Sequence, residues 1–184
     1  MPRLIVLNGP PATGKSTLAG RYAAAHPLTL NLDIDRLRDL IGGWRTDPQA
    51  GGLLARAAAL AAARVHLLAG HDVIVPQLLA RPAFLEQAGA LAAETGASFH
   101  ELVLMDTREN ALRRWAVRSA AAAGSPVATG STVPARFAAE RDEVVGLYDR
   151  LCDMLVSRPD AQIVHSHENE IDRTYRDVLA CLPG

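Results

Sequence analysis

The 184-residue sequence has little cysteine, few aromatic residues and almost no net charge. Both cysteines, Cys152 and Cys181, fall in helical patterns, so we expect reduced thiols in the core of a cytoplasmic protein rather than a disulfide framework. The formal net charge of −1 argues against a protein whose main task is to bind extended nucleic acid. No apolar run approaches the roughly 18 residues of a membrane span, and the N-terminal segment has no small-residue cleavage site of a signal peptide. The expected partner is therefore a small molecule, with no membrane involved.

Alanine and other apolar residues dominate the chain, in strand-length runs that alternate with helical patterns. Apolar residues make up 49% and charged residues 21%, as in a folded domain. Strands are predicted at residues 4–7, 28–33, 72–75, 98–105 and 163–165, and helices at about 15–25, 35–41, 52–69, 82–94, 109–123, 134–157 and 169–182. This alternation predicts an α/β fold with a five-stranded parallel sheet and helices on both faces, in a single domain over residues 1–184. Ligands of such sheets bind beyond the carboxyl ends of the strands.

The segment GPPATGKS, residues 9–16, joins the first predicted strand to the first helix and matches the pattern G-x-x-x-x-G-K-[ST]. Its glycines allow backbone angles that direct amide groups at phosphate oxygens, and the following helix adds its positive end. We expect Lys15 to reach the β- and γ-phosphates of ATP and Ser16 to bind Mg²⁺. The pattern predicts a P-loop NTPase fold. The expected nucleotide-binding residues are Gly9, Pro10, Pro11, Ala12, Thr13, Gly14, Lys15, Ser16 and Thr17.

Two other motifs are missing from the sequence. There is no Asn-Lys-x-Asp, which GTPases use to read their base, and no apolar run ending in Asp-Glu, which motor ATPases carry. A small kinase is the remaining class.

Two aspartates follow the second predicted strand, in the sequence LNLDIDRLRDL. Asp33 and Asp35 are two residues apart and point the same way in an extended segment. One could hold Mg²⁺ through water, for which we choose Asp33, and the other could accept the proton of a hydroxyl, for which we choose Asp35. Arg38, one helical turn later, could clamp an anionic group. The alternative role for Asp35 is to cap the helix that follows.

The P-loop segment together with Asp33, Asp35 and Arg38 resembles the small P-loop kinases that phosphorylate hydroxyl groups. These include polynucleotide 5′-kinases, chloramphenicol phosphotransferases, gluconate kinases and toxin kinases that act on a UDP-sugar. In the polynucleotide kinases an Asp-x-x-Arg after the second strand supplies the base and a clamp, and Asp35 and Arg38 match it. The resemblance implies Mg²⁺·ATP as the phosphate source.

Two further segments resemble the bacterial tunicamycin-resistance proteins more narrowly: VIVPQLLARPAFLEQ (73–87) and LVLMDTRENALRRWAVRSA (102–120). This resemblance implies a nucleoside antibiotic or a related UDP-sugar-like acceptor. Many small kinases end the third strand with Asp, whereas Pro76 and Gln77 stand there in this chain. Gln77 is neutral and both donates and accepts hydrogen bonds, so it suits an uncharged group of the acceptor.

The helix predicted at 109–123 belongs to a basic segment. Arg114 and Arg118 share one face, next to an apolar face that contains Leu112 and Trp115 and is expected to pack on the sheet. With hinges in the loop 124–133, this segment could form a lid over ATP, at about residues 108–136, whose arginines offset the charge of the transferred phosphoryl group. Arg114 and Arg118 are the candidates for contacting ATP, and Arg118 is the candidate for catalysis.

Two weaker features complete the prediction. Leu53, Leu60 and Leu67 form one stripe of the helix at 52–69, and Arg64 on that stripe is expected at its edge. Trp44, in a glycine-rich loop, could stack on the acceptor or pack locally.

The sequence therefore predicts an ATP-dependent kinase of a nucleoside-like or UDP-sugar-like compound, linked to tunicamycin resistance. A nucleoside or polynucleotide 5′-hydroxyl kinase and a nucleotide-binding protein that sequesters its ligand remain alternatives. The expected oligomeric state is a monomer or a homodimer.

Overall fold

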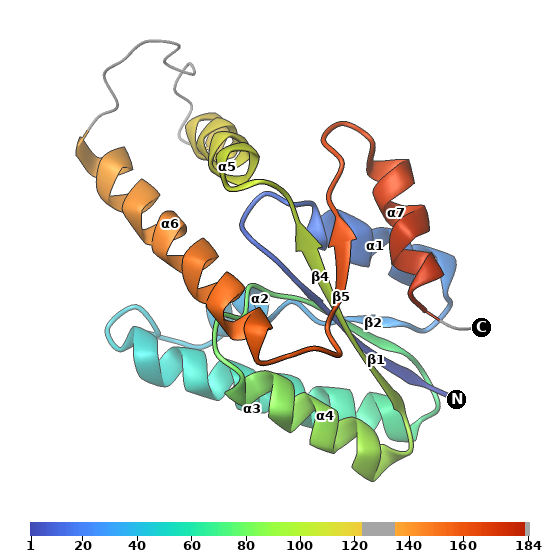
Figure 1. The fold of residues 1–184 in the computed structure, drawn as a ribbon. Coiled ribbons are helices and arrows are strands. Elements are labelled where there is room, and N and C mark those ends of the chain that lie inside the picture. The colour runs from blue at the N-terminus through green and yellow to red at the C-terminus, as the bar shows by residue number, and fades with distance from the viewer. Residues whose placement is uncertain (123–134, 183–184) are drawn as a thin grey trace.

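The fold is a five-stranded parallel sheet covered on both faces by helices, as the alternation of patterns predicts. The computed structural model describes residues 1–122 and 135–182 (Figure 1). The strands lie in the order β2-β3-β1-β4-β5, and every neighbouring pair is parallel. Their bounds are β1 Arg3–Asn8, β2 Leu30–Asn31, β3 Val73–Pro76, β4 Ser98–Met105 and β5 Gln162–His165.

Seven helices are described. They are α1 Lys15–Ala25, α2 Ile34–Asp39, α3 Pro48–Leu68, α4 Ala83–Thr95, α5 Arg108–Ala122, α6 Ala135–Val156 and α7 Ile171–Ala180. The alternating side chains of β1 show how the helices share the sheet: Leu4 and Val6 belong to the core under α3, α4 and the end of α6, whereas Ile5 and Leu7 belong to the core under α1 and α7. Each face of the sheet therefore has its own apolar layer, and Figure 1 shows the helices that cover the two faces.

Helix α3 begins four residues earlier than predicted. Asp47 caps it by accepting a hydrogen bond from the amide of Ala50 at 3.0 Å, and Pro48 occupies its first turn. The predicted leucine stripe is confirmed at Leu67, which is buried, and in part at Leu60, which packs against the core, but it is wrong at Leu53, which is 57% exposed. The rest of the buried face consists of small residues, among them Ala55 and Ala59. Small side chains let the helix approach the sheet closely. Arg64 lies at the edge, as expected, where it pairs with Glu94.

Within the described part of the chain, α3 is the one helix long and apolar enough to cross a membrane by length and composition. Its buried alanine face packs in the core beneath the sheet, as core helices of globular domains do.

Helix α5 packs on α6 and not on the sheet, which corrects the expectation for its apolar face. Ala111 and Trp115 are buried, whereas Leu112 is partly buried. The helix starts just past the carboxyl end of β4 and extends beyond the sheet (Figure 1). The predicted hinge loop at 124–133 lies outside the described residues.

Candidate active site

A cavity of about 750 Å³ lies at the carboxyl ends of the strands, where a parallel sheet of this kind binds its ligands. It brings together the P-loop, the segments that follow β2, β3 and β5, and one side of α5. Its lining residues are Pro11, Ala12, Gly14, Lys15, Ser16, Thr17, Asp33, Asp35, Pro76, Gln77, Leu78, Arg114, Val117, Arg118, Ala121, Leu147, Glu168 and Asn169.

The P-loop backbone needs glycine at two of its positions. Gly9 has a φ of +140°, and a Cβ atom there would lie 2.4 Å from the carbonyl oxygen of Leu104. Gly14 has a φ of +92° and is the N-cap of α1. Ala12 also adopts a positive φ of 65°. These angles form the turn that leads from β1 into the N-terminus of α1, whose positive end attracts anions.

A buried asparagine anchors this loop. The Asn8 side-chain oxygen accepts hydrogen bonds from the amides of Gly9 and Leu79, each at 2.8 Å, and its nitrogen donates to the Leu79 carbonyl at 2.8 Å. The side chain joins the end of β1 to the segment after β3. The two walls of the cavity are thereby tied to each other.

Lys15 lies at the centre of the cavity wall. Its amine donates to the carbonyl oxygens of Gly9 at 2.8 Å and Pro10 at 2.7 Å. Its pKa is lowered from 10.5 to about 7, first by burial of the amine and then by the positive charge of Arg118, against the opposing effect of Asp35. A phosphate group bound beside the amine would raise this pKa again, because a nearby negative charge favours the protonated form.

The structure places the two aspartates differently from the extended arrangement that was expected. β2 ends at Asn31, and Asp33 is the N-cap of α2: its Oδ1 accepts from the amides of Asp35 at 3.0 Å and Arg36 at 3.3 Å. The capping role considered for Asp35 therefore belongs to Asp33. Both carboxyl groups still line the cavity, because the cap and the first turn of α2 face it.

Asp35 has two partners on the second wall of the cavity. Arg38 contacts its Oδ1 at 3.1 Å, and the Gln77 amide donates to its Oδ2 at 3.5 Å. The Oε1 atom of Gln77 and the Nε atom of Arg38 are buried without a hydrogen-bond partner among the described residues. Gln77 lines the cavity, whereas Arg38 lies behind Asp35 and outside the lining.

Trp44 does not line the cavity. The guanidinium groups of Arg38 and Arg45 lie 4.3 Å and 4.4 Å from the centre of its ring. Gly51 of α3 packs against it so closely that a Cβ atom there would lie 2.8 Å from the Cβ of Trp44. The contacts of Trp44 match the local-packing alternative, and they connect it to Asp35 through Arg38.

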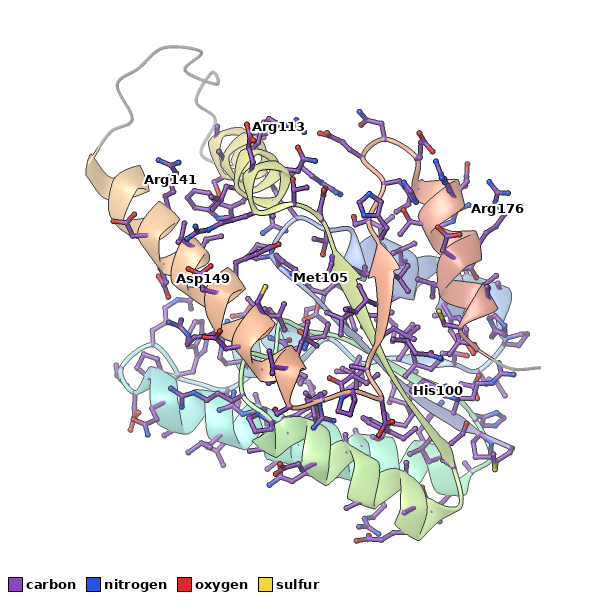
Figure 2. All side chains as sticks on the ribbon, viewed as in Figure 1. His100, Met105, Arg113, Arg141, Asp149 and Arg176 are labelled. Carbon is purple, nitrogen blue, oxygen red and sulfur yellow. The ribbon has the colours of Figure 1, made fainter. Side chains whose placement is uncertain are left out.

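Helix α5 supplies Arg114 and Arg118 to the cavity, as the pattern on its face indicates. The neighbouring Arg113, labelled in Figure 2, pairs with both carboxylate oxygens of Glu168, one at 2.9 Å. Glu168 follows β5 and also lines the cavity, so this exposed pair joins α5 to the opposite rim. The part of the predicted lid at 123–134 lies outside the described residues.

Sequence reasoning missed Asp106 and Ser166, two residues that hold Arg114. Its Nη1 atom donates to Asp106 at 3.2 Å and to the Ser166 hydroxyl at 2.9 Å. Burial by itself raises the pKa of Asp106, but hydrogen bonds from Asn110, the Thr107 amide and Arg114 bring it below its usual value. Asp106 and Ser166 directly follow the strands predicted at 98–105 and 163–165, so the rule for strand ends could have found them.

The fold and the site define the class. A parallel sheet in this order, with a glycine loop that leads from β1 into α1 and the lysine of the G-x-x-x-x-G-K-[ST] pattern facing a cavity at the strand ends, is a P-loop domain of the kinase type. The sequence matches a family described as an AAA domain over residues 4–144, and the chain belongs to that family. No curated protein matches the chain significantly.

Solved structures show the same fold at low sequence identity. The tunicamycin resistance protein of Deinococcus radiodurans has a TM-score of 0.62 and 20% identity, covering 98% of this chain and 95% of that one. A gluconokinase from Sinorhizobium meliloti 1021 has a TM-score of 0.59 and 17% identity, covering 98% and 91%. The APS kinase of Mycobacterium tuberculosis, in complex with AMPPNP and APS, has a TM-score of 0.58 and 18% identity, covering 98% and 97%.

Proposed function

We propose that this protein is an ATP-dependent kinase that phosphorylates a hydroxyl group of a small nucleoside-like or UDP-sugar-like compound. The observation that carries the proposal is the single cavity in which a P-loop and a carboxylate face each other. Lys15, Ser16 and Thr17 line one wall, and Asp35 and Gln77 line the other. A donor phosphate on the first wall and an acceptor hydroxyl on the second would then share one space.

Each residue has a role in this reaction. The P-loop amides and Lys15 bind the phosphates and bring the γ-phosphoryl group toward the second wall. Asp35 orients the acceptor hydroxyl and accepts its proton while the hydroxyl oxygen attacks the γ-phosphorus, and the bond from phosphorus to the bridging oxygen of ADP breaks. Arg118 offsets the negative charge at the phosphates, and Arg38 holds Asp35 in place. The products are ADP and a phosphate monoester of the acceptor.

The oxygen ligands of the site suit Mg²⁺. The Ser16 hydroxyl and the Asp33 carboxylate both line the cavity, and hard oxygen ligands are the ones that this ion prefers in proteins. One oxygen of Asp33 is occupied by the cap of α2, and the other, 3.7 Å from the Nε atom of the exposed Arg36, could hold a water of the ion. Mg²⁺ would supply charge neutralisation at the β- and γ-phosphates.

The second wall favours an uncharged part of the acceptor. Pro76 and Gln77 stand at the end of β3, and the unpaired Oε1 of Gln77 offers a hydrogen-bond acceptor at the cavity. An amide or hydroxyl of a nucleobase or sugar provides the matching donor. The fold similarity to the tunicamycin resistance protein supports tunicamycin as the first acceptor to test, and a role in resistance to it.

The experiment that tests the proposal measures transfer of the γ-phosphate from ATP to candidate acceptors. The protein is incubated with γ-labelled ATP and Mg²⁺ and with tunicamycin, UDP-sugars, nucleosides or 5′-hydroxyl oligonucleotides, and label transfer is measured. We expect transfer to a small nucleoside-like compound, reduced about 10²- to 10⁴-fold in the variant Asp35→Asn, because the general base is removed while nucleotide binding persists. Asp39→Asn, a change to an exposed aspartate of the same helix that does not line the cavity, is the matched control.

The same experiment distinguishes the alternatives. Preferred transfer to an oligonucleotide end would identify a polynucleotide 5′-kinase. Stoichiometric binding of the compound without transfer, unaffected by Asp35→Asn, would identify a sequestering protein and overturn the kinase proposal.

A further inference from the structure

A chain of hydrogen bonds links the lid helix α5 to the P-loop. The Arg114 guanidinium donates to the Ser166 hydroxyl at 2.9 Å, and this hydroxyl donates to the carbonyl oxygen of Thr13 at 2.9 Å. Thr13 in turn closes the loop by donating its own hydroxyl to the Pro10 carbonyl at 2.9 Å. Ser166 and Thr13 are separated by 153 residues in sequence and are both buried, with 2% and 1% exposure.

Asp106 fixes the other side of the same guanidinium. Its side chain is 2% exposed and contacts Arg114 at 3.2 Å, and it also accepts from the Thr107 amide at 2.7 Å and the Asn110 amide group at 3.0 Å. Tyr148 of α6 donates its hydroxyl to the Asp106 carbonyl at 2.9 Å. The arginine is therefore held between buried partners from the ends of β4 and β5, and its side chain is only 15% exposed.

The position of Arg114 gives this arrangement a consequence for nucleotide binding. Arg114 lines the cavity beside the P-loop residues, so its charge faces the space where phosphates bind in the proposed function. An arginine that is already ordered loses less side-chain entropy when it meets an anion. A buried hydroxyl that joins it to the loop also makes the conformations of the two elements depend on each other.

We propose that Ser166 and Asp106 are positioning residues that hold Arg114 toward the phosphates and couple α5 to the P-loop. The inference rests on the proposed binding of a nucleotide triphosphate. Neither residue touches the nucleotide in this proposal. Asp106 acts on affinity through Arg114, and Ser166 acts through Arg114 and through its bond to Thr13 of the P-loop.

A double-mutant cycle tests this dependence. The dissociation constant of AMPPNP with Mg²⁺ is measured by calorimetry for the wild type, Ser166→Ala, Arg114→Ala and the double variant. We expect Ser166→Ala to weaken binding about five- to tenfold when Arg114 is present, because its bonds to Arg114 and Thr13 are both lost, and to have a clearly smaller effect once Arg114 is alanine, where only the bond to Thr13 remains to be lost. An equal loss of AMPPNP affinity from Ser166→Ala in the wild type and in the Arg114→Ala variant, or no loss in either, would overturn the inference.

Control variants separate this outcome from misfolding and from failure of the proposed function. Ser157→Ala removes a serine hydroxyl just past the end of α6 that donates to the Met154 carbonyl at 2.8 Å, and it should leave binding unchanged. A second double-mutant cycle combines Asp106→Asn with Arg114→Ala. Asp106→Asn should weaken AMPPNP binding only when Arg114 is present. Wild-type binding that is lost in Lys15→Ala establishes the nucleotide site independently; a wild type that does not bind AMPPNP would overturn both proposals.

In the free protein, hydrogen exchange gives a readout that needs no ligand. We expect Ser166→Ala to speed exchange in both the P-loop and α5, whereas Ser157→Ala should change neither. Faster exchange confined to one of the two elements would contradict the coupling.

Discussion

The two walls of the cavity differ in how completely their polar groups are paired. On the P-loop wall, the side chains of Asn8, Thr13 and Lys15 all form hydrogen bonds with backbone atoms of the loop or its neighbours. On the second wall, the Gln77 Oε1 atom is buried and has no hydrogen-bond partner among the described residues. The same holds for the Arg38 Nε and Trp44 Nε1 atoms, which lie outside the cavity lining. Among the described side chains, these are three of the five buried polar atoms in that state.

The difference indicates how each wall meets its ligand. Buried polar groups without partners cost free energy, and native proteins keep them where a ligand or a function requires them. The backbone forms the P-loop wall before any ligand binds. The second wall has a buried polar atom that lacks a hydrogen-bond partner in the free protein. A binding partner that supplies matching groups would complete it, which is consistent with an acceptor site selective for polar, uncharged groups.

The largest effect should come from breaking the preformed wall. Gly9→Ala places a Cβ atom 2.4 Å from the Leu104 carbonyl oxygen at a φ of +140°, so the loop must distort. We expect AMPPNP binding to be lost and the free energy of unfolding to fall by about 1–3 kcal/mol or more, as urea titration would measure. Gly20→Ala is the matched control: no atom lies within 4 Å of its added Cβ, and alanine in a helix should stabilise by about 0.5–1 kcal/mol. Unchanged binding in Gly9→Ala would contradict this account of the loop.

Lys15 provides a second test of the same wall, because it is the only lysine in the sequence. With its pKa lowered to about 7, its amine should be acylated at a rate that reaches half its maximum near that pH, although burial slows the reaction. Peptide mass spectrometry locates the label, and the N-terminal amine of Met1 is an internal reference. AMPPNP should protect Lys15 and not Met1. A labelling midpoint near the ordinary lysine value would contradict the burial of this amine.

The same shift predicts how stability depends on pH. Between about pH 7 and 10.5 the unfolded chain carries a proton on Lys15 that the folded chain has lost. The contribution of Lys15 to the free energy of unfolding should therefore rise with pH across this window. Lys15→Met should remove that rise in urea titrations of the free protein, and an unchanged pH dependence in this variant would contradict it.

The contrast between the walls also explains what the sequence could predict. The P-loop is eight consecutive residues whose spacing specifies its backbone, so the motif identified the wall and its residues directly. The five strands and their parallel arrangement follow from buried apolar runs and alternation, whereas their order in the sheet was not predicted. The early start of α3 was missed because the capping signal of Asp47 and Pro48 was assigned to a loop.

Features that depend on packing between distant segments could not be predicted as well. The periodicity of α5 shows that it has an apolar face, but not that α6 covers this face instead of the sheet. The link from Arg114 through Ser166 to Thr13 joins three segments, and its geometry requires the ends of β1, β4 and β5 to meet. Nothing local in the sequence specifies that junction.

A smaller effect should come from the unpaired amide of the second wall. Gln77→Leu removes the Oε1 atom and the contact with Asp35, so we expect the KM of the acceptor identified in the transfer assay to rise about five- to tenfold. The KM of ATP should stay the same, because the P-loop wall is untouched. Gln87→Leu, at an exposed position on α4, is the control. A rise in the KM of ATP alone would place Gln77 with the nucleotide and contradict the division between the walls.

The smallest effect should come from Trp44, which acts on the second wall through Arg38. The ring lies 4.3 Å from the Arg38 guanidinium, and an exposed cation–π contact contributes about 0.5–1 kcal/mol. We therefore expect Trp44→Leu to raise the acceptor KM about two- to fivefold and Trp44→Phe to restore most of the loss, because an aromatic face remains. Arg45→Ala, which removes the other guanidinium over the same ring, should have less effect because Arg45 does not contact Asp35. The double variant of Arg38→Ala and Trp44→Leu separates the two roles of Trp44. If Trp44 acts through Arg38, Trp44→Leu should not raise the acceptor KM further once Arg38 is alanine. A further rise would show that Trp44 stacks directly on the acceptor.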